Sequence, residues 1–398
     1  MSHDLAALFL RHVCQTSPAP LGIEVARAAG ATVWDAGGRA YLDLLAGMGV
    51  ANVGHTHPEV VAAVRAQAER HLHVMVYGEF VQEAQVRLAT RLAGLLAPPL
   101  AVVYFTSSGA EAIEGALKTA RKHTRRRRIV AFEGGFHGDT LGALSIGGNP
   151  VYRAPFEPLL PEVTRLPFDD VAALAAIDTH TAAAVVEPVQ AEAGVRIPGP
   201  AFLPALRRRC DETGALLVLD EVVTGLGRTG RLFAHQHWGV APDLLVLAKA
   251  LGGGLPLGAF VGSPAVMATL GHDPPLAHVT TFGGHPLSCA AGLAALEVVL
   301  RDDLPARAAA LGARLLEHLR ALVGRGGLVA ARGLGLLIGL EFAEAAACVR
   351  CARRALERGL ILNWTLHRDT VVRLAPPLVL TDAEAERALE GIAAALAE

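Results

Sequence analysis

Short apolar runs alternate with amphipathic stretches between about residues 100 and 262. The apolar runs have the length and composition of strands, and the stretches between them have the spacing of helices. Because strands that alternate with helices form a mostly parallel sheet covered on both faces, this pattern predicts a doubly wound α/β fold. The predicted strands are AVVYF, IVAF, AAVVEP, ALLVLD, DLLVLA and LGAFVG.

The pattern changes after about residue 297. A helical stretch at 303–323 is followed by the strand-like GLLIGLEF, a second helix and the strand-like VVRLAP, which indicates a smaller α+β domain. The first 45 or so residues contain a hairpin signal, WDAGGRAYLDL, and we expect them to pack with the C-terminal part. The predicted division is a small domain formed by residues 1–50 and 298–398, and a large domain formed by residues 51–297.

The composition is typical of a folded enzyme. Charged residues make up 19% of the 398 residues, apolar residues make up 52%, and the formal net charge is -2. Such a chain has no overall field that would attract DNA, RNA or an acidic membrane. The one basic cluster, Arg125–Arg128, follows a helical pattern and is interpreted as a solvated helix end rather than a nucleic-acid site.

Neither a secretion signal nor a membrane span is expected. The first residues lack a basic leader, and no apolar stretch approaches the roughly 20 residues that cross a bilayer. The five cysteines are an odd, scattered set, which favours free thiols in a reducing compartment. Cys348 and Cys351 form a CxxC inside a helical pattern without further ligands at zinc spacing, so no metal site is expected. We therefore predict a cytoplasmic protein.

One lysine has an unusual position. Lys118, Lys122 and Lys249 are the only lysines of the chain, so almost every other cation is arginine. Lys249 lies in VLAKALGGG, between an apolar run and a glycine run, where a surface charge has little use. An amine can lose its proton and attack a carbonyl, which a guanidinium cannot do. A P-loop is excluded, because its lysine follows the glycines.

Other strand ends carry groups that suit a phosphorylated ligand, and ligands of open parallel sheets lie beyond the carboxyl ends of the strands. In YFTSSGAEAIEGALKTAR a strand ends at residues 107–110 and a helix begins, which predicts an anion site at the positive helix end. Asp220 ends another strand, and Arg373 in VVRLAP is suited to clamp a carboxylate.

A phosphate cradle, a strand-end acid and an isolated lysine together meet the needs of pyridoxal phosphate. The lysine holds this cofactor as a Schiff base, the helix end holds the phosphate, and the acid keeps the pyridine nitrogen protonated. At 4 Å and an effective dielectric constant near 20, such a charge pair is worth about 4 kcal/mol before desolvation. That is enough to favour the protonated ring.

The sequence also resembles the class III, or ornithine-type, aminotransferases of the fold type I pyridoxal phosphate enzymes. The resemblance runs nearly from end to end, and the matching segments follow the family's order. They are GHTHPEVVAAV, SSGAEAIEGALKTAR, EGGFHGDTLGALS, VVEPVQAEAGV, LDEVVTGLGRTG, PDLLVLAKALGGGLPLGAF, TTFGGHPLSCAAGLAALEVV and VRLAPPLVLT.

The resemblance implies a role for each matching position. Lys249 would hold the cofactor and then carry protons, and Asp220 would pair with the pyridine nitrogen. The remaining cofactor contacts would come from Ser108, Gly109, Ala110, Phe136, Val222 and, from the second subunit of a homodimer, Thr281. The substrate contacts would come from Arg373, Glu192 and Gln190, with Glu187 ordering the site from behind.

Two departures from the family pattern bear on the substrate. Asp139 stands in FHGDT where many members have an arginine that receives a distal carboxylate, and Val223 stands in DEVVTG where many have glutamine. A carboxylate at 139 would repel a second acid group. We therefore expect a primary amine, an ω-amino acid or a diamine, as donor and a 2-oxo acid as acceptor, with Asp139 either attracting a second ammonium group of the donor or facing solvent.

Alternative functions remain open on the same scaffold. One is an aminotransferase of the acetylornithine or 4-aminobutyrate type, and another is an aminomutase, racemase or decarboxylase. A binding protein without activity is disfavoured, because Lys249 and Asp220 are both present.

Overall fold

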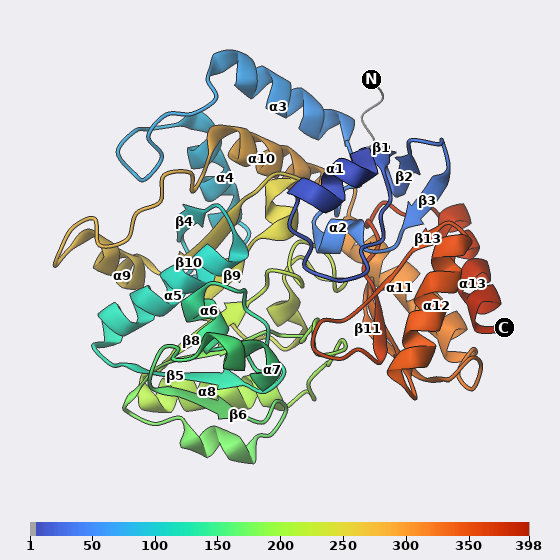
Figure 1. Cartoon of the computed structure of the whole chain (residues 1–398). Helices are drawn as coiled ribbons and strands as arrows, with labels where there is room; N and C mark the ends of the chain where they lie inside the picture. Colours follow the sequence, from blue (N-terminus) through green and yellow to red (C-terminus); the bar gives the residue numbers. More distant parts are fainter. Residues whose placement is uncertain (1–4, 398) are drawn as a thin grey trace.

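A seven-stranded sheet forms the centre of the larger part of the molecule (Figure 1). The structure is a computed structural model and describes residues 5–397. All strands of this sheet are parallel except β10, which pairs antiparallel with β4 and β9. In spatial order the strands are β4 (Val102–Thr106), β10 (Gly258–Gly262), β9 (Leu244–Leu247), β8 (Leu216–Asp220), β7 (Thr181–Val186), β5 (Arg128–Phe132) and β6 (Val163–Leu166).

Helices cover both faces of this sheet, because the strands are apolar on both sides. In β8, Leu217 and Leu219 belong to the core beneath α8 (Phe202–Thr213) and α4 (Glu83–Ala93), whereas Leu216 and Val218 belong to the core beneath α5 (Gly109–Thr124). This alternation is the period of two that a strand imposes. The predicted doubly wound fold is therefore confirmed. The longer helices of this part are α4, α5, α8, α3 (Pro58–Arg70) and α10 (Pro286–Arg301).

The C-terminal part packs a second sheet against helices. The sheet is antiparallel, and its order is β11 (Leu328–Leu334), β12 (Leu337–Phe342), β15 (Val371–Leu374) and β14 (Asn363–Trp364). Its helices are α11 (Leu304–Arg320), α12 (Ala345–Glu357) and α13 (Asp382–Ala397). Cys348 and Cys351 are both buried in α12, as expected for one face of a helix.

Both ends of the chain contribute to this smaller part. The expected hairpin is present, because β2 (Thr32–Asp35) and β3 (Ala40–Asp43) pair antiparallel, with β1 (Val25–Ala29) on the outer side of β2. On its other edge β3 pairs with β13 (Leu360–Ile361), a strand from the far end of the sequence. Figure 1 shows the blue N-terminal strands beside the red C-terminal helices.

The shorter helices connect these elements. They are α1 (Leu5–His12), α2 (Ala46–Gly49), α6 (Leu141–Ser145), α7 (Pro150–Arg153), α9 (Pro264–Met267), and the 3-10 turns η1 (Ala154–Phe156), η2 (Ala172–Ala176), η3 (Ala234–His237), η4 (Lys249–Gly252) and η5 (Ala268–Gly271). None of the helices in residues 5–397 combines the length and the apolar character that crossing a bilayer requires.

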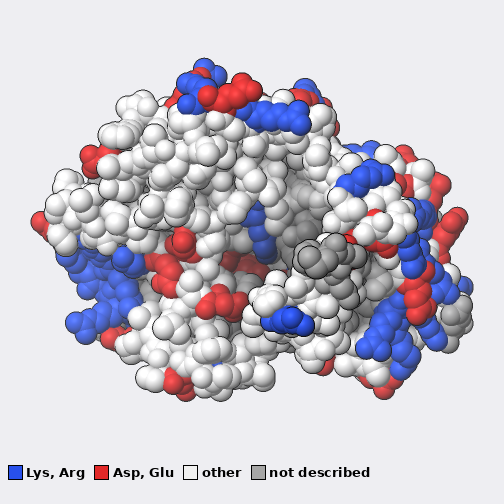
Figure 2. Space-filling model, turned by 45° about the horizontal axis from the view of Figure 1, so that its top comes forward, with Lys and Arg blue, Asp and Glu red and all other residues white. Residues whose placement is uncertain are grey.

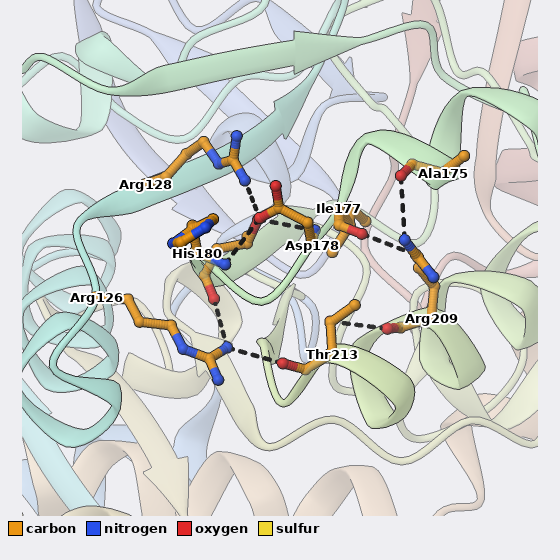
Figure 3. A network of polar contacts seen from close by, with 9 residues as sticks. Arg126, Arg128, Ala175, Ile177, Asp178, His180, Arg209 and Thr213 are labelled. Atoms are coloured by element: carbon orange, nitrogen blue, oxygen red, sulfur yellow. Dashed lines mark hydrogen bonds and ion pairs between the residues drawn. The ribbon is translucent and has the colours of Figure 1, made fainter.

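The basic run at 125–128 differs in part from the predicted solvated helix end. Arg125 has a left-handed backbone that ends α5, but Arg126 donates to the carbonyl oxygens of Thr181 and Thr213 at 3.0 and 2.9 Å (Figure 3). Arg128 belongs to β5 and pairs with Asp178 (Figure 3). The sequence did not reveal these bonds, because both acceptors of Arg126 lie far along the chain. Figure 2 shows Lys and Arg side chains gathered at the left edge of the molecule, and acidic side chains nearer its middle.

Candidate active site

The carboxyl ends of five parallel strands meet at one cavity of about 390 Å³. Its walls come from the segments that follow these strands: residues 107–110 after β4, residues 136–138 after β5, Glu187 after β7, residues 220–223 at the end of β8 and residues 248–249 after β9. Parallel strands place their carboxyl ends on one edge of the sheet, which explains why segments so far apart in sequence are neighbours here.

The predicted anion site is a capped helix end on the cavity wall. Ser108 is the N-cap of α5, and its Oγ accepts the N–H of Glu111 at 3.2 Å. The Glu111 carboxylate accepts the N–H of Ser107 at 2.7 Å, so it holds the residue before the cap. A Cβ on Gly258 would lie 2.2 Å from the Ser108 carbonyl oxygen, so only glycine fits behind this turn. The N–H groups of Gly109 and Ala110, which precede Glu111 in the first turn of α5, have no partner within the helix and can bind an anion.

Lys249 lines the same cavity. It follows β9, which is the neighbour in the sheet of β8, the strand that ends at Asp220. Its backbone has φ = 50°, a left-handed conformation that is strained for a residue with a Cβ. Lys249 is half-buried, and desolvation of its amine lowers the pKa, while the nearby carboxylate of Glu192 opposes the shift. A lysine with a lowered pKa carries a larger share of the neutral amine, which is the nucleophilic form.

Asp220 has a partner that the sequence analysis did not identify. His137 Nδ1 donates to Asp220 Oδ2 at 2.7 Å, and the Val222 N–H donates to Oδ1 at 3.0 Å. Burial lowers the pKa of His137, but the hydrogen bond and charge of Asp220 outweigh it and raise the pKa above its ordinary value. The sequence does contain a signal for His137, because this residue directly follows Phe136 in EGGFHGDTLGALS, a segment that resembles the family.

Glu187 lies at the back of the cavity and is nearly inaccessible to solvent. Its carboxylate accepts the N–H groups of Phe136 and Ala191 at 2.9 and 3.2 Å. Burial raises its pKa to about 7, since it outweighs the attraction of His137. The bond to Phe136 fixes the segment that forms one wall of the cavity, while Val222 lies on the wall formed by the end of β8.

Arg373 and Glu192 form a buried ion pair. Arg373, in β15, donates to Glu192 Oε1, and the second oxygen of Glu192 accepts the Leu366 N–H at 2.9 Å. Burial would raise the pKa of Glu192, but Arg373 outweighs it and holds this pKa below its ordinary value. Met48 Sδ lies 3.6 Å from Arg373, at a turn where Ala46, Gly47, Met48 and Gly49 all have positive φ.

Two further aromatic residues, His367 and Tyr152, form a cluster with Phe136, which lines the cavity. His367 contacts Phe136 edge-on at 5.6 Å and stacks on Tyr152 at 5.2 Å between ring centroids. Burial lowers the pKa of His367, so this ring is neutral at pH 7. Neither His367 nor Tyr152 was identified from the sequence, because single aromatic residues in loops carry no periodic signal.

Five residues expected at the site do not line the cavity: the paired Arg373 and Glu192, and three others. Gln190 bonds its amide to the Glu133 carbonyl oxygen at 2.9 Å and to Arg196 at 3.3 Å. Asp139 is exposed and directly follows Gly138, which does line the cavity. Thr281 is exposed on the surface of the single chain, which is the position expected for a residue that serves a second subunit.

Comparison with known proteins identifies the family. Residues 14–396 match the family model described as aminotransferase class-III. The chain belongs to the class III aminotransferases. It is 46% identical to an acetylornithine aminotransferase of Methanopyrus kandleri over 371 residues, which are 92% of each chain. It is 42% identical to a putrescine aminotransferase of Pectobacterium atrosepticum, over 90% of this chain and 79% of that relative.

Solved structures of aminotransferases have the same fold. An ornithine aminotransferase of Toxoplasma gondii superposes with a TM-score of 0.92 at 34% identity, covering 99% of this chain and 93% of that chain. An (S)-enantioselective ω-transaminase of Thermomicrobium roseum gives a TM-score of 0.91 at 32% identity, covering 99% and 98%. The predicted fold type I architecture is therefore confirmed, and the enzyme class with it.

Pyridoxal phosphate is the cofactor of this family, and the Toxoplasma structure is described with it at the active site. The cavity fits this compound on its own geometry. It presents a capped helix end for a phosphate, an acid held by two hydrogen bonds, and an amine with a lowered pKa. The cofactor predicted from the sequence is thus confirmed.

Proposed function

We propose that this class III aminotransferase moves an amino group from a primary amine, preferably a diamine or an ω-amino acid, to a 2-oxo acid in two half-reactions. The observation that carries the proposal is the single cavity shared by Lys249, Asp220 and the Ser108–Ala110 turn, with the Arg373–Glu192 pair beside it.

Each residue then has a chemical task. Bound pyridoxal phosphate supplies an aldehyde for amines and a ring that accepts electrons. Lys249 would hold the cofactor and, once displaced by the amine, would serve as the general base and acid that accepts and returns a proton. The Asp220 carboxylate is oriented by His137 and the Val222 N–H, and it would pair with the ring nitrogen of the bound cofactor. The turn at 108–110 binds the phosphate.

Arg373 binds the carboxylate of the 2-oxo acid in the second half-reaction. Glu192 occupies the guanidinium beforehand, so it neutralises Arg373 when the amine donor brings no carboxylate of its own. This exchange lets one cavity accept both a carboxylate-free amine and a 2-oxo acid. Gln190 supports the same wall through its bonds to Glu133 and Arg196.

The donor preference rests on Asp139. An exposed carboxylate next to the cavity segment favours a distal ammonium over a distal acid. The relatives named above as putrescine and acetylornithine aminotransferases bracket the two choices. For this chain the proposal is the diamine or ω-amino acid, and an acetylornithine-type donor is the alternative.

A homodimer in the cytoplasm is part of the proposal. Exposed apolar side chains at Leu72, Phe80, Val81, Leu276 and Phe282 provide surface that a second copy would cover. Phe282 adjoins Thr281, so this contact would carry Thr281 to the neighbouring site. Sedimentation of the purified protein tests the dimer, and a monomer with full activity would contradict it.

A donor screen tests the proposed reaction. The purified enzyme with cofactor is incubated with pyruvate or 2-oxoglutarate and with putrescine, 4-aminobutyrate, β-alanine, ornithine or N-acetylornithine, and the new amino acid is measured. We expect the diamine and ω-amino acids to give the highest kcat/KM. Exclusive use of N-acetylornithine would contradict the donor preference, and product formation without a 2-oxo acid would contradict transamination.

A further inference from the structure

Arg228 is fully buried and has no carboxylate partner among residues 5–397. Its guanidinium donates to the carbonyl oxygen of Leu336 at 3.2 Å, to the carbonyl oxygen of Pro376, and to Asn52 Oδ1 at 2.6 Å. Arg228 Nε has no hydrogen-bond partner in the described part of the chain. The guanidinium of Arg228 is therefore held by three neutral acceptors on three segments. It does not line the cavity and is not part of an ion pair among the described residues.

These acceptors join the part that carries Lys249 to the part that carries Arg373. Arg228 follows the Asp220 segment of the large sheet. Pro376 lies two residues after β15, the strand of Arg373, and Leu336 immediately precedes β12, its neighbour. Two of the bonds of the guanidinium thus end on segments adjoining the strands that position Arg373.

Backbone contacts at the same place make the junction tight. The Leu336 N–H donates to the Arg228 carbonyl oxygen at 2.9 Å, so the two residues bond in both directions. A Cβ on Gly335 would lie 2.6 Å from that carbonyl oxygen. Asn52 donates to the Leu226 carbonyl oxygen at 3.0 Å and accepts the Leu378 N–H through its own carbonyl oxygen at 2.8 Å. A shift at Arg228 is therefore transmitted to the segment after β15.

A buried cation at this point is costly. Burial, together with the positive charge of Arg373, lowers the pKa of Arg228 to about 9 against the opposing charge of Asp43. Stability alone would favour an apolar side chain here, because the desolvation of a buried charge without a carboxylate partner is poorly offset. Arginine, unlike an apolar residue, has a planar guanidinium group whose N–H donors can bond several fixed acceptors at once.

We infer that Arg228 is a positioning residue for the acceptor half-reaction: with Asn52 it sets the place of Arg373 relative to the Lys249 cavity. The inference rests on the proposed function, since it assigns Arg373 to the carboxylate of the 2-oxo acid. A donor without a carboxylate makes no use of Arg373. Its half-reaction therefore does not depend on Arg228.

The test compares the two half-reactions in Arg228→Met and Arg228→Lys. Methionine removes every donor at similar length, and lysine keeps the charge but lacks the planar guanidinium group. The holoenzyme is mixed with putrescine, and the change in the visible absorption of the cofactor gives the donor half-reaction. The amino form is then mixed with 2-oxoglutarate, and the reverse change gives the acceptor half-reaction. Calorimetric binding of glutarate, which has no reactive carbonyl, reports the carboxylate site without turnover.

The matched control is Arg126→Met. Arg126 also donates to two backbone carbonyl oxygens, those of Thr181 and Thr213; Figure 3 shows its guanidinium beside Thr213. Thr181 is the first residue of β7, so this site lies at the end of the strand opposite the cavity. For Arg228→Met we expect the dissociation constants of 2-oxoglutarate and glutarate to rise about 10- to 100-fold, the scale on which a small misplacement of a binding group acts. The donor half-reaction stays at the wild-type rate. Arg228→Lys gives a smaller rise, and Arg126→Met gives none.

The possible results distinguish a failure of the positioning role of Arg228 from a failure of the proposed function. If the wild-type absorption responds to no amine, the proposed function fails. If the wild-type enzyme completes both half-reactions while Arg228→Met binds glutarate normally, or slows both half-reactions equally, the positioning role fails. Should Arg228→Met not fold, Arg228→Lys and Asn52→Ala are judged by the same criteria.

Discussion

Replacing Glu192 by glutamine isolates the charge of the ion pair with Arg373. The side chains of Arg373 and Glu192 are 3% and 8% exposed, so water screens their attraction very little. Glutamine has nearly the same volume, and its amide oxygen can still accept the Leu366 N–H. The substitution therefore leaves Arg373 buried without an anion and changes little else.

The expected loss of stability follows from this geometry. Removing one partner of a buried ion pair costs about 3–5 kcal/mol, because the other charge stays buried and uncompensated. Since the introduced glutamine would keep the shape and one hydrogen bond, we expect the lower end, about 3 kcal/mol. The same substitution should also strengthen the binding of the 2-oxo acid. A 2-oxo acid no longer has to displace a carboxylate from Arg373, so its dissociation constant should fall by about 10- to 100-fold, the equivalent of about 1.4–2.8 kcal/mol.

The pH dependence gives a second signature. Burial would raise the pKa of Glu192, but Arg373 holds it below the ordinary value of 4.5. A lowered pKa in the folded state adds stability above pH 4.5, and this stability is lost as the pH falls through the folded value. Urea denaturation of the wild type and of Glu192→Gln should therefore differ most at neutral pH, and the difference should shrink below about pH 4.5.

Glu341→Gln is the control, because Glu341 pairs with Arg332 and Arg368 outside the cavity. It should change 2-oxo acid binding little. The reasoning is refuted if Glu192→Gln is as stable as the wild type at pH 7 and binds the 2-oxo acid no more tightly. It is also refuted if a carboxylate ligand stabilises both proteins equally.

Three further substitutions test the cavity. Lys249→Ala should abolish transfer and the amine-sensitive visible absorption of the cofactor while far-ultraviolet circular dichroism is unchanged; a variant that still transfers would remove Lys249 from the mechanism. His137→Phe leaves the Asp220 carboxylate without its imidazole donor. Such a bond is worth about 1.5–3 kcal/mol, so we expect kcat/KM to fall by about 10- to 100-fold, measured by steady-state kinetics. Asp139→Arg should raise kcat/KM for glutamate relative to putrescine, and an unchanged ratio would place Asp139 outside the substrate's reach.

The sequence predicted most strands of the large sheet, because strong apolar runs mark them. It missed β6, whose four residues VTRL include Thr and Arg and give no apolar signal. It also did not anticipate that β10 runs against its neighbours, since an apolar run carries no direction. The hairpin of β2 and β3 was recognisable from its glycines, but the pairing of β3 with β13 joins segments from opposite ends of the chain.

The site was predictable wherever a residue ends a strand. Ser108, Asp220 and Lys249 all follow strand patterns, and the topology brings them to one edge. His137 and Arg228 were not singled out, because each acts through partners that lie far away in sequence. His137 needs Asp220, 83 positions later, and the acceptor of Arg228 at Pro376 is 148 positions away.

In the proposed mechanism the charges around Lys249 couple acceptor binding to proton transfer. Burial lowers the pKa of Lys249, Glu192 raises it, and Arg373 lowers it again. While Arg373 holds Glu192, the guanidinium neutralises much of the negative charge that would favour a protonated amine. When the 2-oxo acid occupies Arg373, Glu192 is released as a carboxylate, and its free charge raises the pKa of Lys249. Lys249 has to accept and return a proton in each half-reaction, so this change in charge shifts the balance between those two steps when the acceptor is bound. Acceptor binding at Arg373 is thereby coupled to the proton affinity of Lys249.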